Sequence, residues 1–256
     1  MALITIDRVS RVFDDPKRPT GIVALDDVSL TVARNEFLCL LGPSGCGKST
    51  LLNMIAGFDH PTQGTVSVGG QSITAPGADR GVVFQQANLM PWLPVWENVA
   101  FHLKMRGVGK DIRREKAQKF IEMVGLTGFE NHFPSELSGG MNQRVGIARA
   151  LLMNPEVILM DEPFGALDEQ TKMDMHAELI RIWRESQSTI VFVTHGIDES
   201  LALGTHVAVM SARPGRIREL LPIELERPRD PTSKAFNDYK RHILALLRPE
   251  PLRENA

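Results

Sequence analysis

The stretch that decides the fold is an early glycine-rich run, Gly42-Pro43-Ser44-Gly45-Cys46-Gly47-Lys48-Ser49-Thr50. It matches the pattern G-x-x-x-x-G-K-[ST], whose backbone N–H groups surround a phosphate. Residues 36–41 before it form a short apolar run typical of a buried strand, and residues 51–56 after it have a helical pattern that ends at Gly57. A strand, a tight turn and a helix start together make a nest of N–H groups that suits a di- or triphosphate.

Three kinds of residue have separate roles within this loop. Gly45 and Gly47 let the main chain approach the phosphate oxygens, where a Cβ would intrude. Lys48 supplies a positive charge for the β- and γ-phosphates, and the Ser49 hydroxyl can bind Mg²⁺. The alternative is a chance glycine-rich turn, but the flanking strand and helix favour phosphate binding.

Composition narrows the class of protein further. The chain has 256 residues and a formal net charge of -2, which gives no argument for nucleic acid or an anionic bilayer as the main partner. Its two cysteines, Cys39 and Cys46, are expected to be reduced thiols in a cytosolic protein. No leader opens the sequence, and no apolar run approaches the roughly 20 residues that span a bilayer. We therefore expect a protein that is soluble by itself and reaches a membrane only through a partner.

The residues ahead of the phosphate loop predict an antiparallel sheet. Residues 3–9 alternate as a strand does, residues 14–20 read as a polar loop, and residues 23–32 form a second strand region. Phe13 lies between the two strand regions. An exposed aromatic beside a nucleotide site could stack on adenine, and a core position is the alternative; the sequence position alone leaves both open.

The middle of the chain predicts a strand, an irregular segment and a small helical subdomain. Residues 80–85 read as a buried strand that ends on Gln85. Residues 86–97 contain two prolines, Trp92 and Trp96, and exposed tryptophans are enriched at partner surfaces, although a packing role is the alternative. Residues 97–105 and 112–124 then have helical spacing.

A second candidate anion site opens the helix predicted for residues 138–152. Ser138 suits an N-cap, and Gly139 and Gly140 at a helix start can expose backbone N–H groups to an anion. An ordinary capped helix is the alternative. It is less favoured because two successive glycines cost backbone entropy.

Two further strands deliver polar side chains at their ends. Residues 157–160 are apolar and lead to Asp161 and Glu162, whose charges a strand cannot bury cheaply. Ligands of open α/β sheets bind at that edge, so Asp161 is a candidate for the Mg²⁺ shell and Glu162 for polarising an attacking water. A strand end that only solvates two acids is the alternative. Residues 189–194 similarly lead to His195, while the other histidines lack such a context.

The last part of the chain predicts one more strand, at residues 207–210, and a C-terminal helix over residues 232–247. Four side chains recur on one face of that helix: Phe236, Tyr239, Ile243 and Leu247.

Taken together, these motifs resemble the ATP-binding cassette (ABC) family over nearly the whole chain. Residues 42–50 are similar to its Walker A loop, residues 157–161 to its Walker B strand with Glu162 in the catalytic position, and residues 137–143, LSGGMNQ, to the family signature. The resemblance also assigns Phe13 to the adenine-stacking A-loop, Gln85 to the Q-loop and the Mg²⁺ shell, Asp168 to the D-loop at residues 165–168, and His195 to the switch histidine.

The resemblance implies an α/β fold with a P-loop NTPase (RecA-like) core, an N-terminal antiparallel β subdomain and a helical signature subdomain. The core and β subdomain are expected at residues 1–85 and 156–215, and the helical subdomain at residues 86–155. A short C-terminal extension, with its helix, is expected at residues 216–256.

Three phrases resemble the importer branch for nitrate, sulfonates and taurine: residues 90–93 (MPWL), 163–171 (PFGALDEQT) and 213–217 (RPGRI). Asn142 departs from the basic residue or glutamine common in that branch, but leaves Ser138, Gly139 and Gly140 intact.

The family resemblance also implies cofactors and partners. ATP with Mg²⁺ would lie between two cassettes, identical or paralogous, arranged head to tail so that each signature motif covers the partner's γ-phosphate. Permease subunits would dock near residues 85–97, and an extracytoplasmic solute-binding protein would act indirectly. The expected location is the cytoplasmic face of a bacterial inner membrane, as a peripheral subunit.

Two other functions are less favoured. A soluble cassette that clamps nucleic acid or ribosomes usually carries a long coiled coil or a second cassette, and this chain has neither; its balanced charge also disfavours binding to a phosphate backbone. Exporters more often fuse the cassette to a membrane domain.

Overall fold

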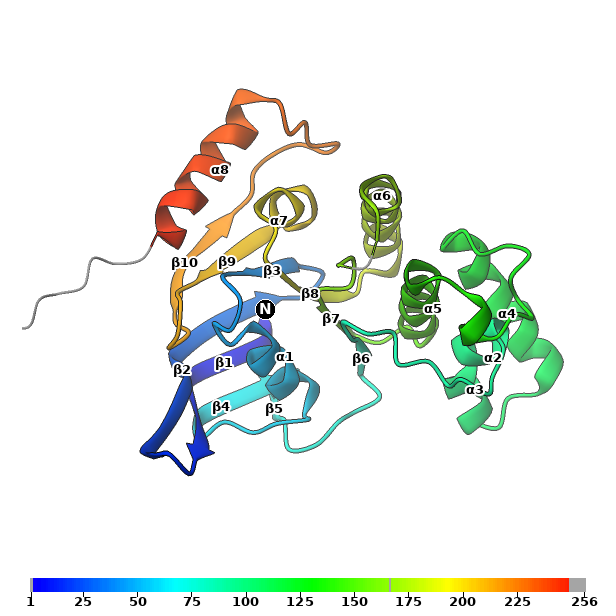
Figure 1. Cartoon of the computed structure of the whole chain (residues 1–256), viewed down its shortest axis with the longest axis horizontal. Coiled ribbons are helices and arrows are strands. Elements are labelled where there is room, and N and C mark those ends of the chain that lie inside the picture. Colours follow the sequence, from blue (N-terminus) through cyan, green and yellow to red (C-terminus); the bar gives the residue numbers. More distant parts are fainter. Residues whose placement is uncertain (1, 166, 249–256) are drawn as a thin grey trace, which may run out of the picture. The chain divides into compact units, whose positions relative to one another are not determined.

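The computed structural model describes residues 2–165 and 167–248 and divides into two compact units. The first unit comprises Met1–Pro76 and Phe192–Ala256, and the second comprises Gly77–Val191; their elements are labelled in Figure 1. Two parts of the sequence predictions lie outside the described residues: Ala166 of the predicted D-loop, and residues 249–256 of the predicted C-terminal extension.

An antiparallel sheet in the first unit has the strand order β2-β1-β4-β5. Its strands are β1 (Ala2–Asp15), β2 (Arg18–Ala33), β4 (Gln63–Val68) and β5 (Gln71–Ser72). The predicted antiparallel sheet is thus confirmed, but the loop predicted for residues 14–20 is wrong. β1 and β2 stay paired to Asp15 and Arg18 and join in a tight turn, because the ladder of backbone hydrogen bonds extends through polar residues.

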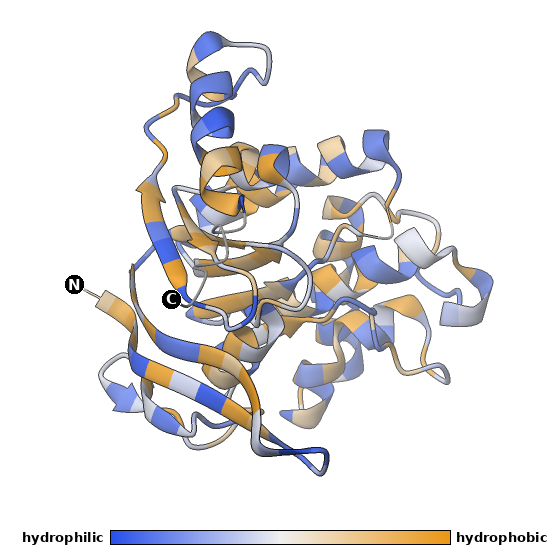
Figure 2. Ribbon diagram, turned by 60° about the vertical axis from the view of Figure 1, so that its left-hand side comes forward, coloured by the Kyte–Doolittle hydropathy of each residue, from blue (hydrophilic) through white to orange (hydrophobic). Residues whose placement is uncertain are grey.

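A second sheet has six strands, and four of them, in the order β10-β9-β3-β8, belong wholly or partly to the first unit. β3 (Phe37–Leu41) pairs in parallel with β9 (His206–Met210), and β9 pairs antiparallel with β10 (Ile217–Pro222). All five residues of β3 are buried, and the strands of this sheet are largely orange in the hydropathy colouring of Figure 2. β10 was not predicted, since its charged residues interrupt the apolar alternation that marks a strand.

Three helices belong to the first unit: α1 (Lys48–Ala56), α7 (Ile197–Leu203) and α8 (Lys234–Leu247). α8 packs against α7 and β9, and its inward face buries Phe236 and Ile243. The predicted C-terminal helix and its apolar face are therefore confirmed for these two residues, while Tyr239 and Leu247 are half-buried.

The second unit contains parallel strands and the helical segments. β6 (Arg80–Val83) pairs in parallel with β7 (Val157–Asp161), and β8 (Thr189–Thr194) follows in the order β6-β7-β8, crossing the boundary between the units. The helices are α2 (Val95–Val99), α3 (Phe101–Met105), α4 (Lys110–Met123), α5 (Gly139–Leu152) and α6 (Glu169–Ser186), with a 3₁₀ turn η1 (Pro134–Glu136). The helix predicted for residues 97–105 is divided at Ala100. Among the helices of the described residues, none has the length and apolar character to cross a membrane.

The end of α1 requires a glycine at position 57. Gly57 has a φ of +83°, and its N–H donates to the Met54 carbonyl oxygen at 3.1 Å, as expected of a C-cap. A Cβ on Gly57 would overlap the Ala75 carbonyl and approach Pro76 N to 2.8 Å. Gly69 has a similar φ of +58°, but a Cβ there would meet nothing within 4 Å.

We therefore expect Gly57→Ala to destabilise the protein by more than about 3 kcal/mol, because backbone strain adds to a steric overlap. The matched variant Gly69→Ala should lose only about 1–2 kcal/mol of folding stability, because it has the strain of a left-handed backbone without a steric overlap. Urea unfolding of both variants measures the difference. Equal losses of stability in the two variants would contradict the close packing of Gly57 against Ala75 and Pro76.

Candidate functional site

The phosphate loop follows β3 and turns back around its own lysine. Lys48 is buried, and its Nζ donates to the carbonyl oxygens of Gly42 at 2.8 Å and Pro43 at 3.0 Å. Gly45 and Gly47 have φ values of +75° and +98°, a region that favours glycine. The loop is thus a tight curve with the ammonium group held inside it, as a phosphate cradle requires.

Gly47 is needed for packing as well as for backbone approach. A Cβ on Gly47 would lie 2.6 Å from Leu25 Cδ2 and 3.0 Å from the Ala24 carbonyl oxygen. The absent side chain therefore lets β2 lie directly against the loop, at the residue that caps α1. The phosphate-loop pattern explains the close approach of the backbone to a phosphate, but it gives no sign of this second reason for the glycine.

Two residues of the RPGRI phrase support the same loop. Gly215 pairs with β2 through Gly215 N–H to Ala24 O at 2.9 Å, and a Cβ on Gly215 would overlap the Cys46 carbonyl. Arg213 Nε donates to the Gly45 carbonyl oxygen at 3.3 Å. No role was predicted for either residue. The only sequence signal was that the phrase resembles an importer branch.

Both cysteines are buried in the first unit, which agrees with the expected thiols. Burial raises the pKa of Cys46, although the nearby Lys48 ammonium lowers it in part. Burial likewise raises the pKa of Cys39, with a further contribution from the Glu199 carboxylate. Both side chains are therefore neutral thiols near pH 7, and neither is an activated nucleophile.

Phe13 lies on β1 with 38% of its surface exposed, so it is not a core residue. The Arg11 guanidinium carbon lies 4.5 Å from the centroid of its ring. That geometry stabilises an exposed aromatic by a cation–π contact. The core alternative for Phe13 is wrong, and adenine stacking stays a prediction.

His195 directly follows β8, which is next to β3 in the strand order, and its side chain is exposed. The hydroxyl of the preceding Thr194 donates to a Glu199 carboxylate oxygen and accepts the Gly196 N–H at 2.9 Å. These bonds close a short turn around His195.

In the second unit, the segments that follow the parallel strands β6 and β7 begin at the same edge of the sheet. Val83 of β6 is level with Met160 of β7, so the segment leading to Gln85 leaves the pair beside Asp161 and Glu162. Glu162 has a φ of +43°, a strained value for a residue with a side chain and one that recurs at functional sites. Gln85 is exposed, as a ligand-binding role requires.

The signature motif forms the start of α5 as predicted. The Ser138 Oγ accepts the Met141 N–H at 3.2 Å, which confirms the N-cap. A Cβ on Gly139 would meet no atom within 4 Å, and its φ is not left-handed, so neither packing nor backbone conformation requires a glycine there. Open space in front of a helix N-terminus favours close approach by an anion.

Asn142, the departure from the branch pattern, has a structural contact. Its Nδ2 donates to the Pro134 carbonyl oxygen at 3.0 Å and so joins η1 to the first turn of α5.

Asp168 is the N-cap of α6 and accepts the Thr171 N–H at 3.0 Å. This hydrogen bond lowers the pKa of Asp168, so its carboxylate is charged at neutral pH.

The segment around Gln85, residues 84–88, is held by α5 from one side. Gln143, which is buried, donates from Nε2 to the Phe84 carbonyl oxygen at 2.9 Å. Arg149 donates to the carbonyl oxygens of Asn88 at 2.9 Å and Ala87 at 2.8 Å. The helix that carries the signature motif therefore also positions the Q-loop segment.

Asn98, on α2, closes the other end of that segment. Its side chain is fully buried, its Oδ1 accepts the Met90 N–H at 2.8 Å, and its Nδ2 donates to the Leu93 carbonyl oxygen at 2.8 Å. No local sequence pattern marks Asn98 for this role.

The two tryptophans differ sharply, which corrects their joint assignment to a docking surface. Trp92 is 72% exposed, whereas Trp96 is only 4% exposed and cannot contribute surface area. The charged ends of Lys110, Arg113 and Arg114 lie 5.6–5.9 Å from the Trp96 ring centroid. Trp96 is thus a core residue of the helical segment that packs beneath three cations.

The predicted site residues are divided between the two units. The first unit brings together the phosphate loop with its backing residues and contains Phe13 and His195. The second contains Gln85, the signature glycines, Asp161, Glu162 and Asp168. Within residues 2–165 and 167–248, no three His, Cys, Asp or Glu side chains are grouped as a metal site.

Comparison with known proteins agrees with these motifs. Residues 25–165 match the family model described as ABC transporter. The chain is 50% identical to the taurine import ATP-binding protein TauB of Burkholderia thailandensis, covering 85% of this chain and 83% of that protein. It is 46% identical to the aliphatic sulfonates import ATP-binding protein SsuB of Bacillus subtilis, with 94% and 93% covered. It is also 46% identical to the nitrate import ATP-binding protein NrtD of Synechocystis, with 96% and 95% covered.

A solved structure shows the same fold. It is a dimeric, post-hydrolysis state of an ATP-binding cassette bound to ADP and Pi, with 34% sequence identity and a TM-score of 0.79. The match covers 87% of this chain and 99% of that chain. The predicted α/β P-loop NTPase fold is therefore confirmed.

We expect Asn98→Ala to release the segment around Met90, because two buried backbone groups lose their partners at a cost of about 1–3 kcal/mol each. Hydrogen exchange of the Met90 amide should accelerate on this change. Asn237→Ala is the matched control, since it removes an asparagine that also donates to two backbone carbonyl oxygens, those of Pro231 and Ser233, and it should leave exchange at Met90 unchanged. Unchanged exchange in Asn98→Ala would show that Asn98 does not hold the segment.

Proposed function

The chain belongs to the ABC transporter family, and we propose that it is the ATP-hydrolysing subunit of an importer for small anions of the nitrate, sulfonate or taurine type. The observation that supports this proposal is the joint presence of two candidate anion sites, the loop curved around Lys48 and the open glycine start of α5. A phosphate-binding enzyme of another class would need only the first.

Each site residue has a role that its surroundings support. The loop N–H groups and Lys48 would bind the β- and γ-phosphates, and the exposed ring of Phe13 would stack on adenine. Glu162 would orient and polarise the attacking water, while His195 would hydrogen-bond the γ-phosphate as charge develops on it. The strained φ of Glu162 supports a functional placement of that carboxylate.

The residues present also fit Mg²⁺. Ser49 and Asp161 offer the hard oxygen donors that this ion prefers, and Gln85 adds a carbonyl oxygen. When bound, Mg²⁺ would neutralise charge on the transferred phosphate.

A second cassette would complete the site. Its Ser138, Gly139 and Gly140 would present helix-start N–H groups to the γ-phosphate, where transition-state charge collects. Two observations support this arrangement: the space in front of Gly139, and the dimeric state of the related cassette bound to ADP and Pi. Asp168, charged at the N-cap of α6, would lie near the same junction.

The permease subunit would dock on the segment between Gln85 and α2. Trp92 supports this, since a large aromatic that is 72% exposed is typical of a partner surface. The contacts of Gln143 and Arg149 would carry a displacement of this segment to α5. The chain would then act as a peripheral protein on the cytoplasmic face of the membrane, with the solute-binding protein acting on the far side.

Replacing Glu162 by Gln should separate ATP binding from turnover. We expect the variant to bind ATP, to hydrolyse it at least about 10²-fold more slowly, and to accumulate as a dimer. The amide cannot act as the base, whereas the ATP that would hold the two cassettes together stays bound. Light scattering at saturating Mg-ATP measures the mass. Lys48→Ala is the control, which should bind ATP weakly and remain monomeric. A Glu162→Gln variant that also remains monomeric would show that the sandwich mechanism is wrong here.

Ser138 and Ser233 allow a matched test of the signature motif, since each caps a helix of 14 residues. Alanine at either position should cost about 1 kcal/mol of folding stability, because the same type of cap bond is lost. Only Ser138→Ala should also lower ATP turnover, by about tenfold or more. Thermal unfolding and a phosphate-release assay check both parts. Equal turnover in the two variants would remove Ser138 from the site.

A further inference from the structure

The helix that follows His195 is too short to hold itself. α7 has seven residues, and isolated helices shorter than about 12 residues are marginal in water. Its N-cap, Gly196, makes no side-chain cap bond. Its first turn is tied to β8 through Thr194, which precedes the exposed His195 and whose hydroxyl bonds Gly196 and Glu199 after it. What fixes α7 therefore contributes to the position of His195.

Two arginines of the C-terminal extension bind the other end of α7. Arg229 Nη1 donates to the carbonyl oxygens of Leu201 at 2.5 Å and Gly204 at 2.6 Å. Arg227 donates to Ala202 O at 2.6 Å and to Leu203 O. The last carbonyls of a helix have no partner within it, and here two guanidinium groups satisfy four in succession. Their positive charges also oppose the negative end of the helix dipole.

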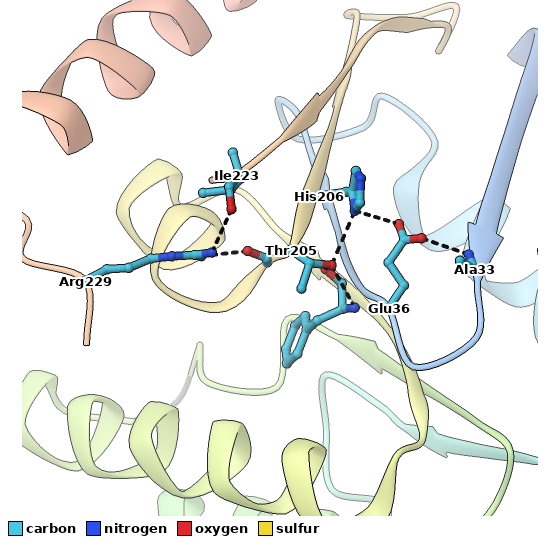
Figure 3. Close-up of polar contacts among 8 residues, drawn as sticks. Ala33, Glu36, Thr205, His206, Ile223 and Arg229 are labelled. Carbon is cyan, nitrogen blue, oxygen red and sulfur yellow. Dashed lines mark hydrogen bonds and ion pairs between the residues drawn. The ribbon is translucent and has the colours of Figure 1, made fainter. Parts of the chain in front are cut away.

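Arg229 is anchored on its own side as well. Its Nη2 donates to the Ile223 carbonyl oxygen at 3.1 Å, shown in Figure 3, and its Nε donates to Leu225 O at 3.1 Å. Ile223 N–H in turn donates to Thr205 O at 2.8 Å, just beyond α7. Burial lowers the pKa of Arg229, as expected of a guanidinium surrounded by backbone rather than water. The guanidinium group thus bridges two segments of backbone.

A third contact reaches the first turn of α7. Lys240, on α8, forms an ion pair with Asp198, with Nζ 2.7 Å from Oδ1 and 2.8 Å from Oδ2. The buried Phe236 and Ile243 hold α8 in place on the same unit. The C-terminal extension therefore contacts α7 at both ends. Lys240 binds its first turn at Asp198, three residues after His195, and the two arginines bind its last turn.

We propose that Arg229, with Arg227 and Lys240, is a positioning residue for ATP hydrolysis, which places His195 by bracing α7. The proposal rests on the proposed role of His195. It gives the C-terminal extension a function that the sequence motifs leave unassigned. A displacement of about 1 Å at a reacting group can cost about 10²-fold in rate, so a brace on the supporting helix affects turnover without touching ATP.

The test compares Arg229→Gln with Arg241→Gln in the full chain, using phosphate release with Mg-ATP. Arg241 is an exposed arginine of α8 that pairs with Asp238 within the same helix. We expect Arg229→Gln to lower kcat about tenfold with KM for ATP nearly unchanged, since the phosphate loop belongs to other elements. Arg241→Gln should leave both constants unchanged. Arg229→Lys should rescue only in part, because an ammonium cannot bridge several carbonyls in a fork.

The same variants in a His195→Ala background separate positioning from general damage. If Arg229 acts through His195, the double variant has the kcat of His195→Ala alone. If the losses multiply, or if Arg229→Gln leaves kcat unchanged, the brace is wrong. If His195→Ala itself leaves kcat unchanged, the proposed role of His195 is what fails.

A milder variant keeps the test decisive if Arg229→Gln does not fold. Lys240→Met removes a surface ion pair with little risk to the core, and it should lower kcat about twofold, again only when His195 is present. A folded Lys240→Met protein with unchanged kcat, beside an unfolded Arg229→Gln, would mean that the extension stabilises the unit and nothing more.

Discussion

The contact of Gly47 with Ala24 and Leu25 is the constraint on which the nucleotide-binding half depends. Gly47 caps α1 with a left-handed φ, and the missing side chain leaves the room in which β2 approaches the loop. Gly215 occupies a similar place against Cys46. A side chain at either position would push the backing segments outward and open the curve that holds Lys48. The antiparallel sheet thus provides the rigid wall behind the phosphate loop.

In the second unit, the single helix α5 has two roles. Its first turn presents Ser138 and the signature glycines, and its later turns hold the Q-loop segment through Gln143 and Arg149. From Ser138 to Arg149 the helix rises about 16 Å. Because a helix of this length is stiff, a displacement of the segment at Phe84, Ala87 or Asn88 would be passed to the signature motif at the start of α5. In the proposed function, a partner bound at this segment would therefore shift the population of cassettes whose signature motif is placed to meet the nucleotide of a second cassette.

The sequence could predict those features that depend on neighbouring residues. The order of strand, glycine turn and helix around Lys48, the Ser138 cap and the acidic end of β7 all have short-range patterns, and the structure confirms them. The contacts between distant residues have no such pattern. Arg213 and Gly45 are separated by 168 positions, and only the folded chain shows that they meet. Trp92 and Trp96 are four positions apart and identical in type, yet one is exposed and the other is buried, since burial depends on which helices pack over each.

The arrangement around His195 follows from a conflict between access and rigidity. A side chain that meets a phosphate must be exposed, so it cannot be fixed by burial of its own ring. The backbone on either side must then contribute to its rigidity, and a seven-residue helix supplies little of it. Arginine suits this task, because its planar fork satisfies several carbonyls at once while keeping its charge when partly buried. A short extension with two arginines and one lysine can therefore order an exposed histidine without narrowing the space in front of it.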